Sequence, residues 1–107
     1  MTHSRLDSLK HLLEDNPNDS FTRYAIALEY NSLGEPETAI AYLKQVIDRD
    51  ANYLPAYRQL GQIFARLNRT QEAKPVYRKG IEIAEATGDT HAKEEMIEEL
   101  EELEDEW

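Results

Sequence analysis

The amino-acid sequence predicts an all-α fold in which about six helices stack as antiparallel pairs. Apolar residues recur three and four positions apart along most of the 107 residues, which is the spacing of one helix face. A similar segment also occurs twice, as LGEPETAIAYL from Leu33 and as LNRTQEAKPVY from Leu67, 34 positions later. A fixed period of that length is typical of proteins built from repeated helix pairs, because one pair cannot bury its apolar face alone.

Short polar breaks separate the helical segments. Pro36 and Pro55 suit the first turn of a helix, where the missing amide hydrogen has no intrahelical partner. Asp19, Thr70 and Asp89 are the expected N-caps, because their short polar side chains can accept a bond from a free amide of the first turn. The predicted helices are 3–15, 20–33, 36–49, 54–67, 71–86 and 90–106, with no strand.

Composition narrows the class of protein. The chain has no cysteine, which excludes disulfides and thiolate nucleophiles. Its first residues lack the basic start and apolar run of a signal peptide, and no stretch approaches the roughly 20 apolar residues of a membrane span. We therefore expect a cytoplasmic protein.

The acidic charge is concentrated at one end of the chain. The net charge of -10 divides into -4 over residues 1–53, +3 over residues 54–87 and -9 over residues 88–107. Nucleic acids and anionic membranes bind clustered Lys and Arg, so this balance argues against both as partners.

The sequence contains no recognisable catalytic or metal-binding pattern. His3, His11 and His91 are scattered, and phosphate-binding glycine loops and nucleophile motifs are absent. The acids from Glu94 to Glu106 would radiate from a helix instead of converging on a calcium ion. The sequence predicts a protein that is not an enzyme and that uses no cofactor or metal.

The repeated segment resembles the tetratricopeptide repeat, whose pattern is W-x2-L-G-x2-Y followed by A-x3-F and a proline. In residues 54–87 the matching positions hold Tyr57, Leu60, Gly61, Phe64, Ala73 and Tyr77. In residues 20–53 they hold Arg23, Ile26, Ala27, Tyr30, Ala39 and Leu43. Both copies lack the closing proline, with Ala51 and Glu85 in its place.

The resemblance implies a right-handed α-solenoid and one domain over residues 1–107. Its parts would be a half-repeat at 1–19, repeats at 20–53 and 54–87, and an acidic capping helix at 88–107. Gly61 would lie where two helices cross closely. Gly80, in the middle of a helix, predicts a nearby backbone, expected to be that of the last helix.

The resemblance also implies a function in protein binding, since the first helices of such repeats line a concave peptide groove. The matching groove positions are Phe21, Tyr24, Leu28, Asn31, Arg58, Gln62, Ala65 and Arg66. Exposed aromatic rings beside two arginines favour an acidic peptide with apolar anchors. The Lys/Asn/Arg clamp of chaperone-binding members is absent, since its places hold Tyr24, Leu28 and Gln59.

Two alternatives remain open from the sequence. The ends of a short solenoid could expose apolar edges that a second copy covers, giving a homodimer or larger oligomer. The terminal LEDEW segment could also occupy the groove as a built-in ligand, with Trp107 as its anchor, or Trp107 could fold back on the preceding helix.

Overall fold

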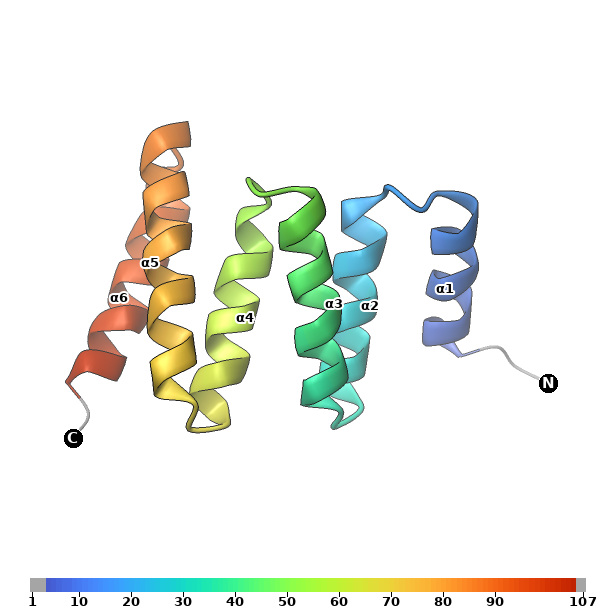
Figure 1. Ribbon diagram of the computed structural model, residues 1–107, viewed down its shortest axis with the longest axis horizontal. Coiled ribbons are helices and arrows are strands. Elements are labelled where there is room, and N and C mark those ends of the chain that lie inside the picture. The colour runs from blue at the N-terminus through green and yellow to red at the C-terminus, as the bar shows by residue number, and fades with distance from the viewer. Residues whose placement is uncertain (1–3, 106–107) are drawn as a thin grey trace. The chain divides into compact units, whose positions relative to one another are not determined.

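The computed structural model describes residues 4–105, and within that range the chain forms six helices and no strand (Figure 1). The helices are α1 (Arg5–Asp15), α2 (Ser20–Ser32), α3 (Pro36–Arg49), α4 (Leu54–Arg66), α5 (Thr70–Thr87) and α6 (Thr90–Glu104). The predicted all-α fold is confirmed; α3 has the predicted bounds, and no end of the other helices differs from its prediction by more than two residues. Among the described residues, no helix combines the length and apolar character needed to cross a bilayer.

The helices form two compact units, Met1–Tyr53 with α1 to α3 and Leu54–Trp107 with α4 to α6. In the first unit α2 packs against both α1 and α3; in the second, α5 packs against α4 and α6, and α6 also reaches α4. Within each unit consecutive helices run antiparallel through short turns (Figure 1). The division into a half-repeat, two repeats and a capping helix stays a prediction.

The turn inside each helix pair has the same geometry in both units. Gly34 and Asn68, 34 positions apart, both adopt the left-handed backbone conformation, with φ of 78° and 60°. Glycine and asparagine are the residues that tolerate this conformation best. In both turns the next residue donates its amide to the carbonyl five positions back, Glu35 to Tyr30 at 2.9 Å and Arg69 to Phe64 at 2.8 Å.

Two of the three expected N-caps are confirmed. Asp19 accepts a bond from the amide of Phe21 at 3.1 Å, and Asp89 accepts one from Ala92 at 3.0 Å. The prediction for Thr70 was wrong, because α5 begins at Thr70 and the cap position is Arg69, which makes no side-chain capping bond. Because the chain turns tightly at Asn68, α5 begins at Thr70, one residue earlier than it would if Thr70 were the cap.

Both helical glycines of the second unit face side chains. A Cβ on Gly61 would lie 2.7 Å from the ring of Tyr77 in α5. One on Gly80 would lie 2.6 Å from Sδ of Met96 in α6 and 3.0 Å from Cβ of Tyr57. The last helix approaches Gly80, as expected, and the atoms nearest to the added Cβ are side-chain atoms of the buried Met96 and of Tyr57.

Candidate functional site

The second unit contains an open cleft of about 580 Å³ between α4 and α6. Its lining residues are Arg58, Gln62, Ala65, Arg66, Asn68, Tyr77, Glu95, Glu98, Glu99, Glu102 and Leu103. All four groove residues that the sequence analysis places on α4 are among them. The cleft therefore combines α4 with an acidic stripe of α6.

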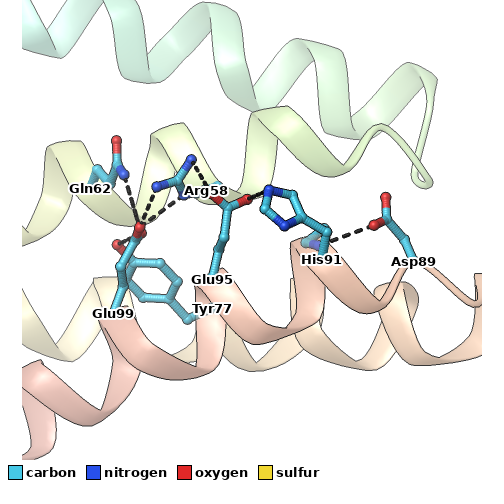
Figure 2. A network of polar contacts seen from close by, with 8 residues as sticks. Arg58, Gln62, Tyr77, Asp89, His91, Glu95 and Glu99 are labelled. Atoms are coloured by element: carbon cyan, nitrogen blue, oxygen red, sulfur yellow. Dashed lines mark hydrogen bonds and ion pairs between the residues drawn. The ribbon is translucent and has the colours of Figure 1, made fainter.

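Glu99 of α6 is the centre of the polar network in this cleft (Figure 2). Its carboxylate accepts two bonds from Arg58, from Nε at 2.8 Å and from Nη2 at 2.6 Å. It also accepts from Nε2 of Gln62 at 3.2 Å and from the hydroxyl of Tyr77 at 3.0 Å. Side chains of α4 and α5 thus form a carboxylate-binding set that the chain's own last helix occupies.

A second carboxylate shares the guanidinium of Arg58. Glu95, one turn before Glu99, lies 3.3 Å from Nη1 of Arg58. Its other oxygen lies 3.4 Å from Nε2 of the exposed His91, an ion pair only when that imidazole is protonated. Because Glu95 and Glu99 are four residues apart, they lie on the same face of α6 and both reach α4.

Apolar packing fixes the orientation of α6. Met96, Leu100 and Leu103 are buried, and they share one face of the helix at spacings of four and three. With that face against α5, the neighbouring stripe of acids is directed into the cleft.

The network raises the pKa of two groups, Arg58 and Tyr77. The bond to Glu99 raises the pKa of Arg58, so its guanidinium keeps its charge throughout. Burial, followed by the negative charge of Glu99, raises the pKa of Tyr77 well above 10.0. Tyr77 therefore stays a neutral donor to Glu99 at physiological pH.

Three charged side chains of the cleft have no hydrogen bond or ion pair within residues 4–105. They are the exposed Arg66 on α4 and the exposed Glu98 and Glu102 on α6. In total four glutamates and two arginines line the cleft, so its formal charge is -2.

The four groove residues predicted on α2 belong to the first unit and carry no charge. Phe21 is 67% exposed, and Tyr24, Leu28 and Asn31 are partly buried. The ring of Tyr24 lies 5.4 Å from that of Tyr53 at an interplanar angle of 57°. Their binding role remains a proposal.

The sequence analysis missed the acidic side of the cleft. Glu95, Glu98, Glu99 and Glu102 are spaced by three and four, a signal visible in the sequence, but the sequence analysis considers these acids only as calcium ligands and as a source of net charge. The reason is that spacing places these acids on one face of α6 but does not identify the residues of α4 that they meet, as Glu99 meets Arg58. The hydrogen bond from Tyr77 of α5 to Glu99 of α6 cannot be predicted from spacing within either helix.

The LEDEW segment, which the sequence analysis considers as a built-in ligand, begins at Leu103 within α6. Leu103 is buried, and Glu104 lies 3.0 Å from Nη2 of Arg78 in α5, so the start of the LEDEW segment packs on α5. Trp107 lies outside the described residues.

Within residues 4–105, no three His, Asp or Glu side chains form a group that could hold a metal ion.

Antiparallel helix pairs with the same turn every 34 residues define a class of helical repeat protein. A model of the tetratricopeptide repeat family matches residues 2–106, and the chain belongs to this family. Proteins of the family are generally non-catalytic scaffolds that mediate protein–protein interaction. Among curated proteins, none matches the chain.

Solved structures agree with this assignment. The chain is similar to a tetratricopeptide repeat domain protein from Salinibacter ruber, solved by NMR, with 32% identity and a TM-score of 0.79 over 83% of this chain and 90% of that one. A crystal structure of a tetratricopeptide repeat domain protein from the same organism gives 32% identity and a TM-score of 0.75 over 80% and 96%. A protein from Bordetella parapertussis, at 20% identity, shares the fold with a TM-score of 0.82 over 95% and 89%.

Proposed function

We propose that this protein is a non-catalytic binding module that captures a peptide or helix of a partner protein in the cleft between α4 and α6. The observation that carries the proposal is the cleft itself, which collects Arg58, Gln62, Ala65 and Arg66 from α4 in one place. A cleft of about 580 Å³ is within the usual range of ligand pockets, roughly 300 to 1,000 Å³.

The lining suits a polypeptide ligand. Free charges at Arg66, Glu98 and Glu102 can fix the register of a bound segment, and Ala65 offers a small surface that a backbone can approach. The buried side chains of Tyr77 and Leu103 form the floor of the cleft, and packing holds them in place. A prearranged floor lowers the entropy lost on binding.

We propose a second contact surface on α2, formed by Phe21, Tyr24, Leu28 and Asn31. Phe21 supports this proposal, because a phenylalanine that is 67% exposed offers an apolar anchor point. The sequence suggested that such a ring would serve an acidic peptide held by two arginines. Of those two arginines only Arg66 is free of an ion pair within the described residues, so the acidic character of the ligand no longer has the support of Arg58.

Peptide display on the purified full-length chain tests the proposal. Random 12-residue peptides selected for binding should, when added to ¹⁵N-labelled protein, shift the amide signals of Gln62, Ala65 and Glu98. Lys79 and Glu82, exposed on α5 and absent from the cleft lining, serve as internal controls. Selected peptides that shift the α5 controls and leave the cleft signals in place would disprove this site.

The runner-up function is self-association. It is favoured by α1, which has no buried residue and leaves Leu12 52% exposed. A second copy could cover that apolar edge. Sedimentation across a concentration series would show a mass that rises with concentration and falls in Leu12→Ser. A monomer at every concentration would exclude this alternative.

A further inference from the structure

We infer that the cleft between α4 and α6 selects a partner segment of net positive charge, with Lys or Arg side chains against Glu98 and Glu102. The inference rests on the proposed binding function and adds the chemistry of the partner. It reverses the expectation from the sequence, which considered the arginines of α4 without the acids of α6.

The first step is that Arg58 is not available to an acidic ligand. Its guanidinium is bound by Glu99 at 2.6 and 2.8 Å and by Glu95 at 3.3 Å (Figure 2). A ligand carboxylate would have to displace Glu99 and would leave α6 without its anchor on α4. Because Glu99 belongs to the same chain and to a helix already docked by Met96 and Leu100, its effective concentration at Arg58 far exceeds that of a free ligand.

The second step is the charge that remains in the cleft. One cation, Arg66, and two acids, Glu98 and Glu102, line it without a hydrogen bond or ion pair among residues 4–105. Glu98 and Glu102 are four residues apart on α6, where like charges repel and destabilise the helix. A bound cation relieves that repulsion, and a bound anion adds to it.

The third step is the shape of the surroundings. The lining of the cleft also includes the apolar side chains of Ala65 and of the largely buried Leu103. Lys and Arg have long apolar stems that cover such surface while their charged ends stay in water. The net charge of -9 over residues 88–107 also attracts cations from a distance and raises the association rate. Arg66, the free cation, would meet an acid or a carbonyl oxygen at the edge of the same segment.

Three matched peptides test the inference. A 12-residue peptide selected on the cleft is made in three versions that differ at two variable positions, both Lys, both Gln or both Glu. We expect the Lys version to bind most tightly and the Glu version least tightly. The difference should shrink when salt rises from about 25 to 300 mM, because exposed ion pairs are screened.

A charge-matched pair of double variants locates the effect. Glu98→Gln with Glu102→Gln removes two acids that line the cleft, and Glu94→Gln with Glu101→Gln removes two exposed acids of the same helix that do not. We expect the first pair to weaken the Lys peptide about threefold to tenfold, as two exposed ion pairs would, and the second pair to weaken it less than twofold. Neither pair touches Glu99, and circular dichroism checks that both variants fold.

The outcomes separate this inference from the proposed function. If the Glu peptide binds at least as tightly as the Lys peptide while shifting the amides of Gln62 and Ala65, the charge assignment is wrong and the binding site stands. If both double variants weaken binding equally, only the net charge matters and the inference fails. If none of the three peptides shifts the cleft amides, the site and the inference fail together.

Discussion

The predicted groove positions of α2 and the cleft face of α4 carry different chemistry at matching positions of the repeated sequence. Tyr24, Leu28 and Asn31 of α2 correspond, 34 positions later, to Arg58, Gln62 and Ala65 of α4. The α2 face is uncharged, and Tyr24 packs on Tyr53 within its own unit. The α4 face carries a guanidinium, which two carboxylates of α6 neutralise.

This difference teaches that an added helix can change which partner the residues at a repeat position contact. In the second unit the polar residues of α4 act as an attachment site for α6 before they can act on a ligand. Arg58, one of the cations that give residues 54–87 a charge of +3, pairs with Glu99 from the segment that carries a charge of -9, so the two charged segments meet at this contact.

The largest expected effect concerns the packing of the second unit. Gly61→Leu should unfold the protein or lower its stability by roughly 3 kcal/mol or more, because even a Cβ would lie 2.7 Å from the ring of Tyr77. The ring cannot easily yield, since it is buried and its hydroxyl is bonded to Glu99. Thermal denaturation of Gly61→Leu and of the wild type measures the difference.

Gly80→Ala is the matched control for that variant. Its Cβ would also be crowded, at 2.6 Å from Sδ of Met96 and 3.0 Å from Cβ of Tyr57. The nearer atom belongs to a flexible side chain that can shift, and alanine favours the helix by about 1 kcal/mol. We expect a change within about 1 kcal/mol. A melting midpoint left unchanged by Gly61→Leu would contradict the close packing of α4 on α5.

The next effect compares the stability lost when one ion-paired glutamate is removed from each unit. Glu99→Ala removes the acceptor of Arg58, Gln62 and Tyr77 and should cost about 1 to 3 kcal/mol, a range that allows for the 36% exposure of the Arg58 side chain. Glu29→Ala in the first unit removes an ion pair with Arg5, whose side chain is 68% exposed, and should cost less than about 1 kcal/mol. Equal losses in urea denaturation would remove the difference between the two faces.

Alkaline pH gives a smaller and more specific effect. The folded protein raises the pKa of Tyr77 above its ordinary 10.0, through burial and through Glu99, while Glu102 adds to the shift and Arg58 opposes it. A raised pKa contributes stability that is fully present below pH 10 and is lost as pH rises above that value. Urea denaturation between pH 9 and 11 should show this loss, and Tyr77→Phe should show less of it. The same slope in both proteins would contradict the assigned role of Tyr77.

The smallest stability effect is expected at Phe21. Because the side chain is 67% exposed, Phe21→Ser should change the free energy of unfolding by less than about 0.5 kcal/mol. If α2 forms part of the binding surface, the same variant should weaken partner binding. A protein that loses stability and keeps its partner would assign Phe21 to the core instead.

The sequence predicts the helices well because their signals are local. Apolar spacing, Pro36 and the caps at Asp19 and Asp89 each depend on a few neighbouring residues. The error at Thr70 was avoidable, because α3 has its cap position at Glu35 and the 34-residue period places the next one at Arg69.

The site was harder to predict because it depends on contacts between distant segments. The α4 residues could be placed on one helix face from their spacing, but their partners are some forty positions away, as Arg58 and Glu99 are. The bounds of α5 and α6 were predicted to within two residues. The way in which α6 lies against α4 depends on the packing of three helices, which is not a local property of the sequence.

The central claim is that Glu99 occupies the guanidinium of Arg58, and a double-mutant cycle tests it most directly. Arg58→Gln, Glu99→Gln and the double variant would be compared by urea denaturation at low salt. We predict a favourable coupling energy of about 1 kcal/mol or more, because each single variant leaves a partly buried charge without its strongest ion pair. Arg58 would keep only Glu95, and Glu99 would keep only the neutral donors Gln62 and Tyr77. Losses that add within about 0.3 kcal/mol would contradict the account, since the two residues would then act independently.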